Sequence, residues 1–493
     1  MPDPLDGLTP AQREVAAHRG GPLVVVGAAG TGKTRALLAR HAWLASAGGL
    51  APEQVLALTS SEEAADALRT GVEDELERGF EELCVHTVHG FGARLLRDEA
   101  LEAGLDPFVV PVAPADRLAM LLERVDELTL QVHDFQGNPA TLLASVIARI
   151  DRLKEAMVTA DEVARWAAAL PQGDQRTERE REFAGLYETH DRMLREQGAL
   201  DFGDLLLRAV ALLKDKPHVR ARVSARWRHV LVDDAQDLEL AGLRLVLALG
   251  SEHGGLTAAG DDDCAVRRGR GAAPSNLRDL AGALPGARSV RLERSLRAPA
   301  TILKAAQAVV APNEGRIEKA ADAPPGGSVR FWRCANERAQ AQGTAADIER
   351  LVRSGVAPQE IGVLVRSVRN EGQAIAVALE ERAVPYHLAG ATAFFQRAEV
   401  KDVLAWLRLL VDPGDAGAVV RALARPPIEL RSIDIARCVQ ISRRPCRACA
   451  GARSARSGRC RSSAARWVGG PARARRRRRR RGRRAAAARR ARL

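Results

Sequence analysis

The feature that most constrains this chain is a glycine-rich stretch at residues 27–34, Gly-Ala-Ala-Gly-Thr-Gly-Lys-Thr. It fits the pattern G-x-x-x-x-G-K-[ST] at every fixed position. An apolar run at residues 23–26 leads into it, and a helix-like segment at residues 35–45 leads out. A strand, a glycine-rich loop and a helix in this order are what a phosphate-binding P-loop requires. The flanking segments and the Gly-Lys-Thr ending argue against the alternative, a chance glycine-rich turn.

The residue types in this loop predict how it holds a nucleotide. Glycines let backbone N–H groups curl around phosphate oxygens, and the following helix points its positive end at the same anion. Lys33 is expected to neutralise the β- and γ-phosphates of ATP, and Thr34 to bind Mg²⁺. ATP and Mg²⁺ are therefore the expected cofactors. The predicted nucleotide contacts are Gln12, Gly27, Ala28, Ala29, Gly30, Thr31, Gly32, Lys33, Thr34 and Arg35.

Gln12 is included because of its place on a short helix ahead of the P-loop. Thr9 is a good N-cap, and Pro10 suits the first helical position. The Gln12 amide carries one donor and one acceptor group, which matches the edge of an adenine. A helical Gln is usually only solvated, but its position shortly before a P-loop favours nucleotide contact.

Beyond the P-loop, short apolar runs alternate with helical segments, which predicts an α/β protein. We expect strands at residues 55–59, 83–89, 229–232, 255–259, 289–292, 328–331 and 361–365. Residues 91–200 are mostly helical and interrupt the first alternation, as an insertion would. An amphipathic helix is expected at residues 394–410.

Two carboxylates directly follow the apolar run at residues 229–232. The carboxyl end of a strand is where a P-loop ATPase places its second Mg²⁺ contact. Thr34 and Asp233 are therefore the predicted metal ligands. An acidic surface loop is the alternative, and a P-loop in the same chain argues against it.

Taken together, these blocks resemble the UvrD/Rep-type DNA helicases of superfamily 1 over roughly residues 5–440. The blocks follow the family's order: residues 8–12 (the adenine-reading Q motif), 27–34 (motif I), Thr59 with Ala64 and Ala65 (motif Ia), 86–89 (motif Ib), 200–206 (the L-D-F-x-D-L-L segment), 233–237 (motif II), 260–263 with 270–272 (motif III), 292–293 with Arg297 (motif IV), and 394–402 (the F-F-x-R-x-E-I-K-D helix).

The resemblance implies an α/β P-loop NTPase with RecA-like domains, each a parallel sheet with helices on both faces. ATP would lie between two such domains, single-stranded DNA would cross their tops, and cleft closure would drive 3′–5′ movement. The implied domains are 1A (residues 1–91 plus 197–288), a helical insertion 1B (92–196), an incomplete 2A (289–410), the start of 2B (411–442) and a disordered Arg-rich tail (443–493).

The resemblance also assigns roles to single residues. Lys33 would stabilise phosphate charge, Asp233 would hold Mg²⁺, and Asp234 would activate the attacking water. Gln236 would couple the γ-phosphate to DNA, and Arg297 would contact that phosphate from domain 2A. The implied DNA-binding residues are Thr59, His86, His89 and Arg270.

The chain departs from the family pattern at several positions. Asp234 stands where the family has Glu, which draws the base back by about one C–C bond and slows hydrolysis. Cys264 stands where motif III has Gln. Four positions lack the family's aromatic side chains for stacking: Ser60, Arg267, Gly269 and Leu296. We find no motif V and no motif VI.

The function that follows is an ATP-dependent 3′–5′ DNA helicase or translocase of DNA repair or recombination, truncated and impaired as written. Its partners would be single-stranded or tailed duplex DNA and a partner subunit or repair proteins. Two alternatives stay open: an ATP- and DNA-binding module that does not unwind, and the motor subunit of a helicase–nuclease complex.

The basic charge of the chain is concentrated at its C-terminal end. The net charge is +13, but residues 443–493 contain 21 Arg and no Lys, Asp or Glu. Removing these 21 from the 75 Lys and Arg leaves 54 against 62 Asp and Glu, a net charge of −8 for residues 1–442. The tail is open to three interpretations: a nucleic-acid-binding arm, a nuclear-import-like signal, or an out-of-frame product of GC-rich DNA, which we favour.

The remaining sequence features point to a cytoplasmic protein. No apolar run reaches the ~18–20 residues of a membrane helix, and the N-terminus has no signal-peptide pattern. The 7 Cys form no disulfide framework. Cys446 and Cys449 have zinc-ligand spacing but lack a second well-spaced pair.

Overall fold

The computed structural model describes residues 3–76, 82–109, 111–133, 139–319, 322–388, 398–411, 416–425, 428–431 and 434. The chain divides into two compact units, residues 1–330 (unit 1) and residues 331–493 (unit 2). The expected tail at 443–493, half of residues 411–442, and residues 394–397 of the expected helix lie outside the described residues.

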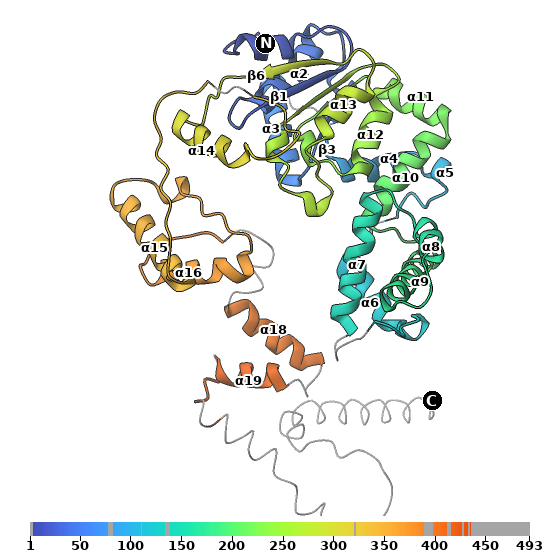
Figure 1. The fold of residues 1–493 in the computed structure, drawn as a ribbon, viewed down its shortest axis with the longest axis vertical. Helices are drawn as coiled ribbons and strands as arrows, with labels where there is room; N and C mark the ends of the chain where they lie inside the picture. The colour runs from blue at the N-terminus through green and yellow to red at the C-terminus, as the bar shows by residue number, and fades with distance from the viewer. Residues whose placement is uncertain are drawn as a thin grey trace, which may run out of the picture. The chain divides into compact units, whose positions relative to one another are not determined.

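Unit 1 is built on a six-stranded sheet in which every neighbouring pair is parallel (Figure 1). The strand order is β3-β2-β4-β5-β1-β6. The strands are β1 (Leu23–Gly27), β2 (Val55–Thr59), β3 (Cys84–Thr87), β4 (His229–Val232), β5 (Leu256–Gly260) and β6 (Arg288–Leu292). The predicted α/β fold with a parallel sheet is thus confirmed. Parallel strands end at one edge, which is where open α/β sheets bind ligands.

Alternate side chains of the central strands enter two different hydrophobic cores. On β1, Val24 and Val26 join one core, whereas Leu23 and Val25 join the other. This is the two-residue period of a strand that is buried on both faces. One face is covered by α1 (Pro10–Ala16), α2 (Lys33–Ser46) and α3 (Glu62–Leu76), and the other by α4 (Val88–Asp98), α10 (Phe202–Asp215), α11 (Pro217–Arg226), α12 (Leu240–Gly250) and α13 (Asn276–Ala283).

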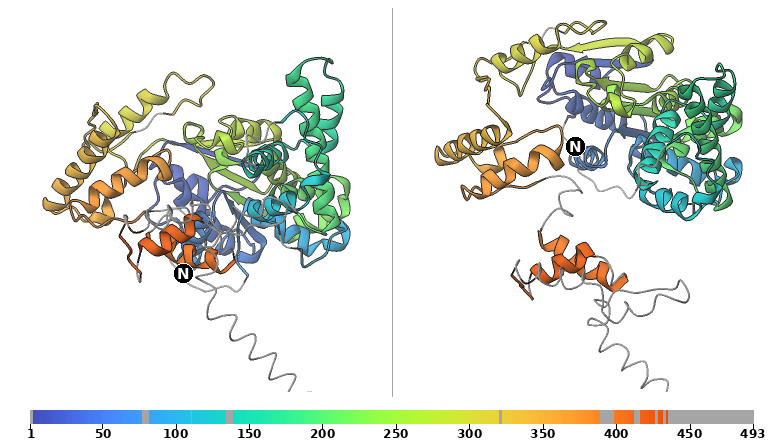
Figure 2. Two further views of the ribbon diagram at one scale, coloured as in Figure 1. Left: turned by 90° about the horizontal axis from the view of Figure 1, so that it is seen from below. Right: turned by 60° about the horizontal axis from the view of Figure 1, so that its bottom comes forward.

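A helical insertion with its own core interrupts this domain. It contains α6 (Pro114–Glu123), α7 (Pro139–Glu155), α8 (Ala160–Ala168) and α9 (Gln175–Glu196). Figures 1 and 2 show these helices as a bundle beside the sheet. The Val112 amide donates to the Leu200 carbonyl at 2.7 Å, where the chain enters and leaves the bundle. Because α4 packs into the sheet core and α5 (Ala100–Ala103) follows it, the separate bundle begins later than the expected residue 92.

Buried charges fasten the bundle to α10. Asp201 accepts a hydrogen bond from the Asp204 amide and so caps α10. The same carboxylate lies 2.9 Å from Lys154 Nζ on α7 and 3.2 Å from Arg117 on α6. Buried charges are stable only when paired. The two aspartates of the L-D-F-x-D-L-L segment thus hold α10 against the insertion.

The last strand of the sheet differs from the expected domain plan. We expected residues 289–292 to open the second domain, but β6 pairs with β1 in the first sheet. Helix α14 (Ala300–Val310) follows β6, and unit 1 extends to residue 330. A strand's own sequence does not reveal its pairing partner, which explains the misplaced boundary.

Unit 2 is helical in the residues that the structure describes. Helices α15 (Glu337–Arg353) and α16 (Gln373–Glu380) share a small core, and α18 (Ala398–Val411) and α19 (Ala416–Ala424) follow. The expected strands at 328–331 and 361–365 are wrong: neither segment is part of a strand. A strand needs a neighbour for its backbone hydrogen bonds, and neither segment pairs with a strand among the described residues.

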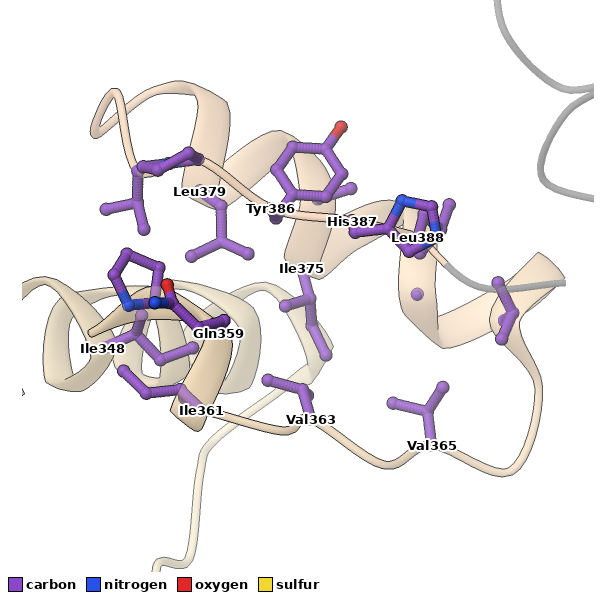
Figure 3. Close-up of a pocket in the computed structure, with 16 residues that line it drawn as sticks. Ile348, Gln359, Ile361, Val363, Val365, Ile375, Leu379, Tyr386, His387 and Leu388 are labelled. Atoms are coloured by element: carbon purple, nitrogen blue, oxygen red, sulfur yellow. The ribbon is translucent and has the colours of Figure 1, made fainter. Parts of the chain in front are cut away.

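An apolar pocket of about 690 Å³ lies in unit 2 beside residues 361–365 (Figure 3). Ile361, Val363 and Val365 line it, together with Ile375 and Leu379 of α16. It contains none of the predicted site residues. Among the described helices of both units, none is long and apolar enough to cross a membrane.

Candidate nucleotide-binding site

The P-loop joins the carboxyl end of β1 to the first turn of α2, as predicted. Gly30 and Gly32 have φ angles of 80° and 78°, which lie in the left-handed region that favours glycine. Lys33 folds back over the loop, and its Nζ donates to the carbonyls of Gly27 at 2.9 Å and Ala28 at 3.2 Å. The loop therefore brings an ammonium group and the start of a helix to one small surface, which is the chemistry of a phosphate site.

The two predicted metal ligands meet directly in the structure. Thr34 Oγ1 donates to Asp233 Oδ2 at 2.7 Å, and Asp233 is 7% exposed at the end of β4. Burial raises the pKa of Asp233 to about 6, and the negative charge of Asp234 adds to the rise. A hydroxyl and a carboxylate side by side supply the oxygen ligands that Mg²⁺ prefers.

Asp234 has an unusual backbone conformation for a non-glycine residue. Its φ and ψ are 53° and 46°, in the left-handed region. Such a conformation costs on the order of 1–3 kcal/mol and tends to occur at functional sites. The Asp234 amide donates to Asp233 Oδ1 at 3.1 Å, so the carboxylate before it holds this turn in place.

Gln236 connects motif II to the loop that follows β5. Its Nε2 donates to Asp234 Oδ1 at 3.2 Å, and its Oε1 accepts from the Asp261 amide at 3.0 Å. A Cβ at Gly260 would lie 2.5 Å from Gln236 Oε1, so the close approach requires glycine there. A continuous series of hydrogen bonds therefore runs from Thr34 through Asp233 and Asp234 to Asp261.

Comparison with known proteins decides the family. Residues 8–285 match the model of the UvrD/REP helicase N-terminal domain, and residues 290–442 match the UvrD-like helicase C-terminal domain. This chain belongs to the UvrD/REP helicase family.

Curated UvrD/REP helicases show how much of a relative this chain spans. It is 33% identical over 434 residues to the ATP-dependent DNA helicase UvrD1 of Mycobacterium tuberculosis, covering 86% of this chain and 55% of that protein. It is 29% identical over 437 residues to DNA helicase II of Escherichia coli, covering 88% and 58%. It is 28% identical over 425 residues to the ATP-dependent DNA helicase PcrA of Bacillus subtilis, covering 86% and 56%. The chain thus spans little more than half the length of these relatives.

The glutamine of the expected Q motif lies in an unexpected environment. Gln12 is 0% exposed, and its Nε2 donates to the carbonyls of Thr31 at 3.1 Å and Gly32 at 3.4 Å. Its Oε1 accepts from the Thr9 amide at 3.0 Å, which completes a capping box with the predicted N-cap. Gln12 thus braces the P-loop in this structure, and adenine contact stays a prediction.

Arg297 lies in unit 1, whereas we expected it to come from the second domain. The neighbouring Leu296 amide donates to the Gly30 carbonyl at 2.8 Å. A Cβ at Gly30 would lie 3.2 Å from the Cβ of Arg297, whose side chain is exposed. The segment after β6 therefore rests on the P-loop and brings Arg297 next to it.

The other predicted nucleotide contacts belong to the loop itself. Thr31 Oγ1 donates to the Ala28 carbonyl at 2.9 Å. Ser295 Oγ reaches the Ala29 carbonyl at 3.5 Å, a second contact from the segment after β6. Arg35 is exposed in the first turn of α2.

The predicted DNA-binding residues gather near the carboxyl edge of the sheet. Thr59 ends β2, is 1% exposed, and its hydroxyl has no hydrogen-bond partner in the described part of the chain. Burial and then Arg94, which lies 3.1 Å from the ring nitrogen, lower the pKa of His86 to about 4. We expected residues 83–89 to form a strand, but β3 ends at Thr87 and His89 lies in the first turn of α4. Its Nε2 is 3.7 Å from Glu239. The side chain of Arg270 lies outside the described part.

Three residues that contact the loops beside the site have no signal in the sequence. Asn276 Nδ2 donates to the carbonyls of Ala235, Gln236 and Leu238, and so clamps the turn after Asp234. Arg316 and Lys319 bind the aspartates that follow β5. All three act from distant parts of the chain, so only the fold reveals them.

Proposed function

We propose that unit 1 binds ATP·Mg²⁺ at residues 27–34 and hydrolyses it to drive 3′–5′ movement along single-stranded DNA, as an ATP-dependent DNA helicase. The observation that carries this proposal is the Thr34–Asp233 hydrogen bond beside Lys33, at the carboxyl edge of a parallel sheet. The relatives' names, ATP-dependent DNA helicases, support it. A role in DNA repair or recombination, with repair proteins or a partner subunit, extends the same proposal.

The residues supply the parts that phosphoryl transfer needs. The reaction depends on positive charge against the phosphates and on a group that positions the attacking water. Lys33 supplies a fixed positive charge. Thr34 and Asp233 would hold Mg²⁺, which would supply further positive charge against the phosphates. Asp234 accepts the proton of the attacking water, held in place by its bond to Gln236.

Gln236 connects the reacting phosphate to the rest of unit 1. Its amide touches Asp234 on one side and the Asp261 backbone on the other. A change at the γ-phosphate that moves this amide must move the loop after β5 as well. Single-stranded DNA is proposed to lie along the same edge of the sheet, near Thr59 and His89.

Asp234 offers a direct test of the catalytic assignment. A glutamate would extend the carboxylate by one bond toward the water, and small misplacements of a catalytic group can cost up to about 10²-fold in rate. Asp234→Glu in the full chain is expected to raise kcat for ATP hydrolysis roughly tenfold. The exposed residue Asp279 on α13 provides the matched control, Asp279→Glu. An unchanged or lower kcat in Asp234→Glu would contradict the base assignment.

Two observations favour a second candidate, an ATP- and DNA-binding module that does not unwind. The carboxylate of Asp234 is one bond shorter than the family's glutamate, and Cys264 cannot provide the hydrogen bonds of an amide. A 3′-tailed duplex with a fluorescent label, with Lys33→Ala as the blank, distinguishes the candidates. Strand release near the blank supports the module, and robust ATP-dependent release supports the helicase.

A further inference from the structure

A cluster of opposite charges ties the loop after β5 to a segment more than 50 residues away. Asp261, Asp262 and Asp263 follow β5, and the segment at residues 313–319 follows α14. Lys319 Nζ lies 3.0 Å from Asp261 and 2.9 Å from Asp263, and it also bonds to Asp262. Arg316 makes two hydrogen bonds to Asp263, at 3.0 and 2.7 Å.

The cluster is buried, so its charges depend strongly on one another. The side chains of Lys319, Asp261 and Asp262 are 3%, 4% and 1% exposed. Burial alone lowers the pKa of Lys319, but Asp262, Asp263 and Asp261 together outweigh it, and the pKa is raised. The lysine is therefore a permanent cation among three carboxylates. Without it, these carboxylates would repel one another in a poorly solvated place.

We propose that Lys319 is a positioning residue of the nucleotide site, which fixes Asp261 and through it the amide of Gln236. The inference rests on the proposed function, because Gln236 is assigned there to sense the γ-phosphate. Lys319 contacts Asp261 Oδ1, and the Asp261 backbone amide donates to Gln236 Oε1. The buried ammonium of Lys319 is thus linked to Gln236, the proposed γ-phosphate sensor, through Asp261 alone.

Substituting Arg316 distinguishes two possible roles of Lys319: positioning Asp261, or only attaching residues 313–319 to the loop after β5. It binds only Asp263 among the three aspartates, whereas the Ile317 amide donates to Asp262 at 2.6 Å. Loss of Lys319 therefore leaves two ties between the segment and the loop. Loss of Arg316 removes the charged contact with Asp263 but leaves the Lys319–Asp261 contact in place. The two variants differ in whether Asp261 keeps its cation.

The test compares the affinity for a triphosphate with the affinity for a diphosphate. Fluorescent ATPγS and ADP analogues are titrated against the full-length chain in Mg²⁺. Because Gln236 senses only the γ-phosphate, Lys319→Met is expected to lower the ATPγS-to-ADP affinity ratio roughly tenfold, the size of one charge-assisted hydrogen bond. Lys319→Arg, which keeps the charge, should recover most of the ratio, and Arg316→Met should leave it unchanged.

The outcomes separate this proposal from the function on which it rests. An unchanged ratio in Lys319→Met, or equal weakening of both nucleotides, overturns the positioning role. If thermal melting shows that Lys319→Met does not fold, Lys319→Gln replaces it. An ATPγS-to-ADP affinity ratio equal to that of the parent then overturns the positioning role, and a lowered ratio supports it. A parent chain that binds neither nucleotide overturns the proposed function itself, and the positioning role falls with it.

Discussion

Thr34 and Asp233 are 199 residues apart in the chain, yet the Thr34 hydroxyl donates a 2.7 Å hydrogen bond to the Asp233 carboxylate. The parallel sheet creates this contact, because β1 and β4 both end at the same edge. The pair lies where a P-loop protein is expected to bind Mg²⁺. Asp234 connects to it through a hydrogen bond to Asp233, and Gln236 connects through Asp234. The geometry of this pair leads directly to a pH-dependent prediction.

Nucleotide affinity in the presence of Mg²⁺ should fall as the pH drops through about 6. Burial, aided by the charge of Asp234, raises the pKa of Asp233 to about 6, and a protonated carboxyl does not bind Mg²⁺. Titrations with a fluorescent ATP analogue between pH 5 and pH 8 measure the effect. Asp233→Asn is the control, because it removes this carboxyl but leaves the protonation of the nucleotide's phosphates unchanged. If affinity depends on pH in the same way in the parent and in Asp233→Asn, the assignment of Asp233 as a Mg²⁺ ligand is contradicted.

Acid should destabilise unit 1 partly through His41 on α2. Burial lowers the pKa of His41 to about 4, and neither ring nitrogen has a hydrogen-bond partner among the described residues. The unfolded chain takes up a proton near pH 6.5 but the folded chain does not, so the free energy of unfolding falls as the pH drops from 6.5 to 4. The loss amounts to at most about 3 kcal/mol.

Urea unfolding at pH 5 and pH 7.5 measures this loss for His41. The variant His41→Leu should lose part of the difference in unfolding free energy between the two pH values. His218→Leu is the matched control, since the His218 side chain is 58% exposed. Equal pH dependence in His41→Leu and the parent would show that His41 is not the source.

DNA binding by the whole chain should be dominated by residues 443–493. This segment carries 21 Arg, while residues 1–442 have a net charge of −8. Each phosphate contact releases counterions, so the affinity falls steeply with salt. Removing residues 443–493 should flatten the plot of log affinity against log salt for single-stranded DNA. An unchanged slope would mean that residues 1–442 make the phosphate contacts.

The sequence predicts the local parts of this site well. β2 and β4 have the expected bounds, and the P-loop, the N-cap at Thr9 and the helix after Lys33 are all present. Each depends on neighbours in sequence: apolar runs, glycines before a helix, and a capping residue. The same reasoning placed Asp233 at the end of a strand.

The parts that sequence reasoning missed depend on distant partners. Nothing in residues 288–292 shows that they pair with β1, and nothing near Lys319 reveals three aspartates more than 50 residues away. The apolar run at 361–365 has a strand-like composition, but it has no strand partner in the described part of unit 2. The burial of Gln12 was also missed, because it depends on how α1 packs against the P-loop.

The central claim is that residues 27–34 bind ATP, and Lys33→Ala tests it most directly. A labelled ATP titration in Mg²⁺ compares the parent chain, Lys33→Ala and the control Lys214→Ala, an exposed lysine on α10. Loss of the ammonium over the loop should weaken binding at least tenfold, because it removes a charge-assisted contact to the phosphates. Lys214→Ala should match the parent. Equal affinity in Lys33→Ala and the parent would contradict the assignment of this loop as the ATP site.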